Sequence, residues 1–286
     1  MRPSETTTGR GGARPRPGRP GRPSDGVAGR LPWVLVVPAV AGMVFLVLPP
    51  AGLLIRAPWP TLLERLGEPQ VLEALRLSLV TATIATLVCL LLGVPLAWLL
   101  ARVSFPGRRL VRALITVPLV LPPVVGGVAL LLVLGRRGLV GQWLEQAFGF
   151  SLPFSTAGVV VAEAFVAMPF LVISVEGALR AADLRFEEAA ATLGASRWTV
   201  FRRVTLPLVA PGIMAGAVLC WARALGEFGA TITFAGNFPG RTQTMPLAVY
   251  LALETEPEAA IVLSLVLLAV SVVILAGLRD RWVTGP

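Results

Sequence analysis

Long apolar stretches alternate along this chain with short connections that carry arginine. A helix that crosses a bilayer needs roughly 20 mostly apolar residues, and six windows of about that length can be traced along the sequence. Only 14% of the residues are charged, against about 25% in soluble domains. The sequence therefore predicts an all-α polytopic membrane protein with about six transmembrane helices.

The predicted spans follow a polar N-terminal segment. Residues 1–30 are rich in Arg, Pro, Gly, Ser and Thr and hold almost nothing to bury, which predicts a disordered tail. A secretory signal is the competing interpretation, but its charged region would be unusually long and no A-x-A cleavage site is evident. Residues 31–286 then form one transmembrane domain, with spans at Trp33–Ile55, Leu77–Val103, Leu110–Leu134, Ala157–Val175, Leu208–Ala235 and Ala259–Leu278.

The distribution of arginine predicts the orientation of the spans. Cytoplasmic connections collect Lys and Arg. If the N-terminus is cytoplasmic, the inner connections after the tail and the C-terminal end hold eleven Arg residues, and the outer connections hold six. Both termini, the tail included, are therefore expected in the cytoplasm, and the longest inner connection is residues 180–207.

The residue types exclude several functions. All 25 basic residues are Arg, because the chain has no Lys and no His. A P-loop needs its Lys against the phosphates, so this chain is not expected to be an ATPase of that type, and imidazole metal sites are also excluded. The net charge of +9 is explained by the membrane rather than by nucleic acid. Cys89 and Cys220 lie in apolar segments and are expected to be buried thiols. We expect no catalytic residue, metal site or bound cofactor.

The connection at residues 180–207 is predicted to form two short helices. Asp183 is placed to cap the first helix, and Gly194 suits the left-handed position that ends it. Ser196 is placed to cap a second helix that runs through Val204, where Pro207 is expected to stop it. In the second helix Trp198 and Phe201 share one face. A helix–glycine–helix shape with exposed aromatic side chains is suited to docking a partner.

The same connection resembles the EAA loop of bacterial ABC importer permeases. Its sequence has Glu-Ala-Ala, then glycine after three residues, and Val-x-Leu-Pro after nine more. In that family the loop is the coupling helix that seats in a groove of the ATPase subunit. The competing interpretation is an amphipathic loop on the membrane surface. The resemblance implies that the ATPase-coupling residues are Glu187, Glu188, Ala189, Ala190, Gly194, Leu206 and Pro207.

The fifth span contains two opposite charges, Arg223 and Glu227. Arg near the centre of a membrane helix costs about 2.5–3.5 kcal/mol, so both side chains are expected to face protein or a wet cavity and to pair. The pair is either a structural ion bridge, which is favoured because a paired Arg is a poor anion ligand, or part of the transport pathway. The surrounding ARALGEFGA stretch resembles molybdate and sulfate permeases.

The third span is rich in helix-breaking residues. Prolines and glycines within ten residues predict a break or kink, and such breaks often line the pathway of a transporter. A packing kink is the alternative. The VLPPVV string here, and the FAGN stretch that starts at Phe234, resemble molybdate permeases more than sulfate permeases. The candidate pathway residues are Pro118, Pro122, Pro123 and Gly126.

The resemblance covers about residues 32–282 and implies a type I, MetI-like ABC permease in a bacterial plasma membrane. It implies a homodimer with two ATPase subunits, which hold ATP and Mg, and an extracytoplasmic oxyanion-binding protein. Molybdate or tungstate is the implied substrate, and sulfate or thiosulfate is the alternative. A proton-coupled secondary transporter with Glu163 and Glu176 as relays, or a membrane scaffold or sensor, would make the loop resemblance a coincidence.

Overall fold

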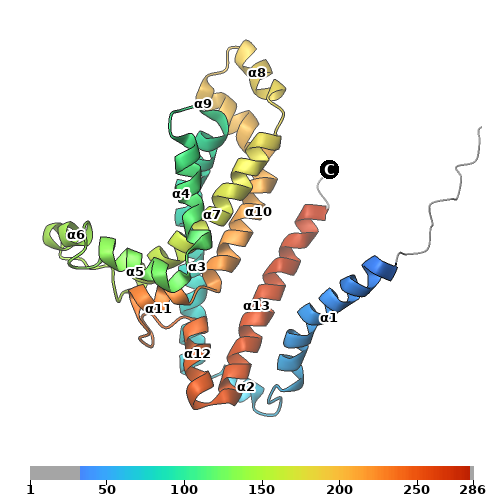
Figure 1. The fold of residues 1–286 in the computed structure, drawn as a ribbon, viewed down its shortest axis with the longest axis vertical. Helices are drawn as coiled ribbons and strands as arrows, with labels where there is room; N and C mark the ends of the chain where they lie inside the picture. The colour runs from blue at the N-terminus through green and yellow to red at the C-terminus, as the bar shows by residue number, and fades with distance from the viewer. Residues whose placement is uncertain (1–32, 284–286) are drawn as a thin grey trace, which may run out of the picture. The chain divides into compact units, whose positions relative to one another are not determined.

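The computed structural model describes residues 33–283, with side chains up to residue 274, and the predicted tail at residues 1–30 lies outside that range. Helix α1 (Trp33–Ile55) contains the boundary at Pro49–Pro50 between two separate units of the chain. Every regular element in the described range is helical (Figure 1). The other elements are α2 (Leu62–Leu66), α3 (Pro69–Arg102), α4 (Arg108–Val120), α5 (Pro123–Leu134), α6 (Gly141–Phe148), α7 (Thr156–Ala181), α8 (Arg185–Thr192), α9 (Arg197–Val200), the π-helical turn η1 (Phe201–Thr205), α10 (Leu206–Leu225), α11 (Gly229–Ala235), α12 (Met245–Thr255) and α13 (Pro257–Val283).

The prediction of about six spans is confirmed within the described residues. Five helical stretches are long and apolar enough to cross a membrane, and a sixth span is made by α4 and α5, which meet at a bend of 119°. Several boundaries differ from the prediction, at both ends of the fifth span among others. α3 begins eight residues before Leu77, α7 continues six residues past Val175, and the fifth span ends at Leu225 instead of Ala235.

Helices α3, α7 and α10 form the core of the larger unit. Their contact surfaces carry small residues, which bring helix backbones close together in a membrane. On α10, a Cβ added at Gly212 or Gly216 would lie within 3 Å of the Cβ atoms of Ala178 or Ser174 on α7. Cys89 and Cys220 are fully buried in this core as free thiols, as predicted. The packing of this core thus fixes the positions of three helices that carry or adjoin the candidate site.

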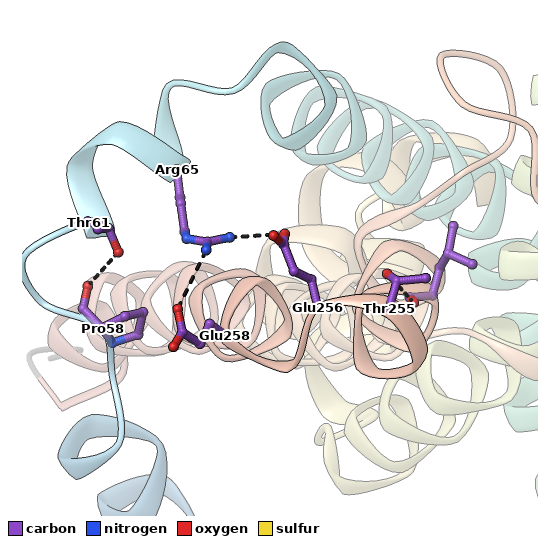
Figure 2. Close-up of polar contacts among 7 residues, drawn as sticks. Pro58, Thr61, Arg65, Thr255, Glu256 and Glu258 are labelled. Carbon is purple, nitrogen blue, oxygen red and sulfur yellow. Dashed lines mark hydrogen bonds and ion pairs between the residues drawn. The ribbon is translucent and has the colours of Figure 1, made fainter.

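An ion-pair cluster joins α2 to the corner between α12 and α13. Arg65 of α2 contacts Glu256 at 3.1 Å and Glu258 at 3.5 Å, as Figure 2 shows. Both carboxylates are more than half exposed. Their contribution to stability is therefore small, because water and salt screen exposed pairs.

Candidate functional site

The connection between α7 and α10 folds as the helix–glycine–helix shape that the sequence predicts, and we call α8, α9, η1 and the turn between them the elbow. Asp183 Oδ1 accepts a hydrogen bond from the Arg185 backbone N–H at 3.0 Å. Gly194 ends α8 with φ of +82°, a left-handed conformation that strains residues with a Cβ. Ser196 Oγ accepts from the Thr199 N–H at 3.2 Å. The Ser196 cap and the glycine turn are confirmed. The Asp183 cap is not, because Leu184 holds the cap position of α8 without a side-chain hydrogen bond, and the contact of Asp183 with Arg185 is a turn just before it.

Pro207 does not stop the second elbow helix, so that prediction is wrong. The helix continues from Arg197 to Leu225 over 29 residues. In η1 the Leu206 backbone N–H bonds to the Phe201 carbonyl, five residues back, which is the wider spacing of a π-turn. Proline is tolerated in the first turn of a helix, where its missing N–H has no partner to lose. The π-turn creates such a position inside a longer helix, and the elbow is therefore continuous with the fifth span.

The elbow is attached to the end of α3 by two contacts. Glu187 Oε1 lies 2.8 Å from Arg102 Nη2, and both side chains are less than one-fifth exposed. Trp98, one turn earlier on α3, meets Phe201 edge to face with ring centroids 6.2 Å apart. Glu187 therefore faces inward and anchors the elbow, while the side chains around it remain available for a partner.

The opposite surface of the elbow is exposed. Glu188, Ala189 and Gly194 are all exposed, and Glu188 forms no ion pair with a described residue. Two large apolar side chains accompany them, with Leu193 88% and Phe186 59% exposed. Sequence reasoning missed these two, although an apolar residue in a polar connection was the available signal. The remaining predicted coupling residues are half-buried on α8 or belong to the first turn of α10: Ala190, Leu206 and Pro207.

The break in the third span meets a second break, in the fifth span. The chain leaves α4 at Leu121 and starts α5 at Pro123, as the prolines predict. A Cβ added at Gly229, the first residue of α11, would lie 2.8 Å from the Cβ of Pro123. A Cβ added at Gly127 of α5 would lie 2.9 Å from the Ala230 carbonyl oxygen. The start of α5 and the start of α11 thus cross in backbone contact, and we call this contact the crossing.

Two of the predicted break residues have other roles. Pro118 lies inside α4 without ending it. Gly126 is in the first turn of α5, where its backbone N–H bonds to the Pro122 carbonyl at 3.1 Å. A Cβ added at Gly126 would lie 3.1 Å from the ring of Phe165 on α7. The break itself is therefore made by Pro122 and Pro123.

The ion pair between Arg223 and Glu227 is confirmed, and it spans the second break. Arg223 Nη2 in the last turn of α10 lies 2.6 Å from Glu227 Oε2. Glu227, in the segment between the two helices, is 1% exposed, and its other oxygen accepts from the Ala230 backbone N–H at 2.7 Å. One carboxylate therefore ties the end of α10 to the start of α11. This geometry supports the structural interpretation of the pair.

Two buried carboxylates on α7 contact neighbouring helices. Glu163 accepts a hydrogen bond from Thr81 Oγ1 of α3 at 2.9 Å. Glu176 lies 2.5 Å from Arg112 of α4 and 2.8 Å from Arg180 of its own helix. The sequence predicted neither Thr81 nor Arg112 as a partner, because both belong to other helices, whereas Arg180 follows Glu176 at i+4 spacing on α7.

Comparisons with known proteins identify relatives over most of the chain. Residues 93–285 match the family described as "Binding-protein-dependent transport system inner membrane component". The chain is 51% identical over 255 residues to the molybdenum transport system permease protein ModB of Mycobacterium tuberculosis (strain ATCC 25618 / H37Rv), which covers 89% of this chain and 96% of that protein. ModB of Escherichia coli (strain K12) is 44% identical over 73% of this chain and 92% of its own length. The sulfate transport system permease protein CysT of the same strain is 38% identical over 76% and 78%.

Solved structures share the fold at lower sequence identity. A subunit of a bacterial ABC transporter involved in alginate import superposes with a TM-score of 0.72 at 18% identity, over 88% of this chain and 96% of that one. An inward-facing form of the MetNI methionine ABC transporter gives a TM-score of 0.58 at 18% identity, over 74% and 94%. The predicted MetI-like fold is therefore confirmed.

Proposed function

This chain belongs to the family of binding-protein-dependent transport system inner membrane components, the membrane-spanning permeases of ABC importers, and we propose that its substrate is molybdate or the similar oxyanion tungstate. The observation that carries the proposal is 51% identity to a ModB permease over 96% of that protein. Sulfate or thiosulfate is the second candidate, because CysT is 38% identical.

The elbow is the proposed contact with a separate ATPase subunit. Its exposed surface combines Glu188 with the apolar side chains of Phe186 and Leu193, and apolar contacts enclosed by polar ones are typical of protein interfaces. ATP and Mg would then bind to the ATPase, and this chain would supply no catalytic residue. This assignment places the elbow and both termini in the cytoplasm of a bacterial cell, in agreement with the arginine distribution.

The other proposed partners are a second copy of this permease and an extracytoplasmic oxyanion-binding protein. The relative involved in alginate import has been solved in complex with its periplasmic protein, which supports a partner of that kind here. If a binding protein recognises the anion, the permease itself does not need a tight anion-binding site. This fits the pairing of Arg223 with Glu227 at 2.6 Å, because a neutralised Arg holds a passing dianion weakly.

The proposed mechanism uses the continuous helix from Arg197 to Leu225. Closure of the two ATPases on ATP would displace the elbow, and the helix would carry that displacement to the crossing of α5 with α11. The spans would then exchange inward-open and outward-open states, and nucleotide binding biases that equilibrium because it favours one of them.

Reconstitution tests the proposal directly. The chain, its ATPase and its binding protein are placed in proteoliposomes, and uptake of labelled molybdate is measured with and without ATP. We expect ATP-dependent uptake that unlabelled tungstate competes for more strongly than sulfate. Stronger competition by sulfate would indicate a sulfate permease instead. Uptake driven by a proton gradient without ATP would overturn the proposal of ATP-driven transport.

A further inference from the structure

An apolar groove lies where the elbow meets α3. It has a volume of about 310 Å³ and is lined by Pro95 and Trp98 of α3 and by Arg197, Trp198 and Phe201 of the elbow. Trp198 and Phe201 stack with ring centroids 5.7 Å apart, at an interplanar angle of 27°. Trp198 is nevertheless 68% exposed. The proposed ATPase contact does not explain this groove, because two of its lining residues belong to a membrane span.

The groove continues into an apolar stripe along α3. Ile84, Leu87 and Leu91 are 43%, 59% and 73% exposed, and their spacing places them on the helix face that Pro95 and Trp98 share. A chain of methylene groups that enters the groove could therefore follow α3 into the hydrocarbon layer. Such a path suits an acyl chain better than it suits a folded protein surface.

Positive charge lies beside the aromatic side chains of the groove. Arg197 lines it, and Arg202, outside the lining, follows Trp198 by four residues on the same helix face. Both arginines are exposed, and neither forms an ion pair with any residue between 33 and 274. Guanidinium groups match the geometry of phosphate oxygens, and basic pockets at the ends of membrane helices bind anionic headgroups.

We propose that this groove binds one anionic phospholipid, with its phosphate on Arg197 and Arg202 and an acyl chain along the α3 stripe. The site would fasten the elbow to the membrane at the start of the continuous helix. The anionic-lipid content of the membrane would then influence how far the elbow moves. Figure 1 shows α8 beyond the end of α7, at one extreme of the bundle and next to α9.

Fluorescence quenching in nanodiscs tests the site. The purified chain is placed in phosphatidylcholine discs that contain equal fractions of either brominated phosphatidylglycerol or brominated phosphatidylcholine. Seven tryptophans are present, so the signal of Trp198 is taken as the difference between the parent and a Trp198→Phe variant. We expect the anionic lipid to be preferred on the order of tenfold at this position, given two arginine contacts.

Matched variants separate a bound lipid from general charge attraction. The preference should disappear in Arg197→Gln/Arg202→Gln, and it should persist in Arg185→Gln, which removes an exposed elbow charge from α8 rather than from the helix that carries Trp198. Native mass spectrometry provides a second measurement, in which the parent retains phosphatidylglycerol and the double variant does not. Equal quenching by both lipids would show that the groove contacts lipid without preferring an anionic headgroup, and it would overturn the proposal. Complete shielding of Trp198 by added ATPase would also overturn it and assign the groove to a protein interface.

Discussion

The elbow and the crossing are both built around glycine, but they use it for different purposes. At the crossing, Gly127 and Gly229 let two backbones touch, and a Cβ at Gly229 would lie 2.8 Å from Pro123. In the elbow, Gly194 has no atom within 4 Å of an added Cβ, and its requirement is the φ of +82°. The crossing therefore depends on volume, whereas the elbow depends on backbone shape and on its exposed surface.

This difference fits the proposed roles. A part that a partner displaces needs few attachments to its own chain, and the elbow has one ion pair and one aromatic contact with α3. A part that redirects movement inside the membrane must be closely packed, because packed contacts switch between discrete arrangements rather than deform. Added volume should therefore affect folding at the crossing and only coupling at the elbow.

The largest effect is expected from Gly229→Leu. The new side chain would overlap Pro123 and the Val124 backbone nitrogen, and overpacking of this kind costs about 3 kcal/mol or more. We expect a lower melting temperature in detergent and loss of uptake. Gly177→Leu is the matched control, because Gly177 is exposed on α7 with nothing within 4 Å of its added Cβ. Equal melting temperatures for the two variants would contradict the crossing.

Gly194→Arg should abolish ATP-driven uptake while the protein still inserts into the membrane at the parent level. A left-handed conformation costs an ordinary residue about 1–2 kcal/mol, which is too little to unfold the bundle but enough to disturb the elbow. Gly194→Asn should retain most uptake, since Asn tolerates this conformation. Uptake by the Arg variant at the parent rate would count against a coupling role.

Glu188→Lys should also abolish ATP-driven uptake, because it reverses the exposed charge of α8 and retains both partners of the Arg102–Glu187 pair. Copurification with the ATPase measures the effect, and the melting temperature of the permease alone should not change. If the variant kept both uptake and the ATPase, the docking surface would lie elsewhere.

Substitutions at Glu227 should separate its charge from its hydrogen bond. Glu227→Gln retains an oxygen for the Ala230 N–H but loses the charge that pairs with Arg223, whereas Glu227→Ala loses both. We expect the melting temperature to fall in the order parent, Glu227→Gln, Glu227→Ala. The Ala variant should lose about 2–3 kcal/mol of stability, because the Ala230 N–H loses its acceptor and Arg223, which is 26% exposed, loses its partner. The charge swap Arg223→Glu/Glu227→Arg should recover only part of this loss, since Arg accepts no hydrogen bond. Full recovery would mean that the hydrogen bond from the Ala230 N–H to Glu227 contributes nothing.

The smallest effects are expected from two ion pairs that differ in burial. A double-mutant cycle on Arg102 and Glu187, both less than one-fifth exposed, should give a coupling of about 1 kcal/mol or slightly more. The same cycle on Arg65 and Glu256 (Figure 2), where the carboxylate is 63% exposed, should give between zero and about 0.5 kcal/mol. A reversed order would show that exposure does not set the strength of these contacts.

Local rules predicted much of the elbow from the sequence. Gly194 and Ser196 each act within three residues of their own position, so their side-chain chemistry was sufficient. Pro122 and Pro123 likewise predicted the break in the third span. The rule that proline ends a helix failed at Pro207. The π-turn that accommodates this proline is a feature of the surrounding helix and not of the proline itself.

Contacts between distant segments could not be predicted in the same way. Gly127 and Gly229 are about a hundred positions apart, and neither carries a mark that identifies the other as its neighbour. The inward direction of Glu187 depends on Arg102, which arginine counting had used only to orient the membrane. Sequence reasoning thus identified the two breaks separately, and only the folded chain showed that they meet.

The uninterrupted run from Arg197 to Leu225 has a mechanical consequence. At 1.5 Å per residue it is a rod about 43 Å long, which exceeds the hydrocarbon thickness of about 30 Å. A flexible joint at Pro207 would absorb a push from outside the bilayer before it reached the interior. A continuous helix acts as a lever arm instead, so a tilt of only about 5° displaces one end by roughly 4 Å relative to the other, about the rise of two to three helical residues.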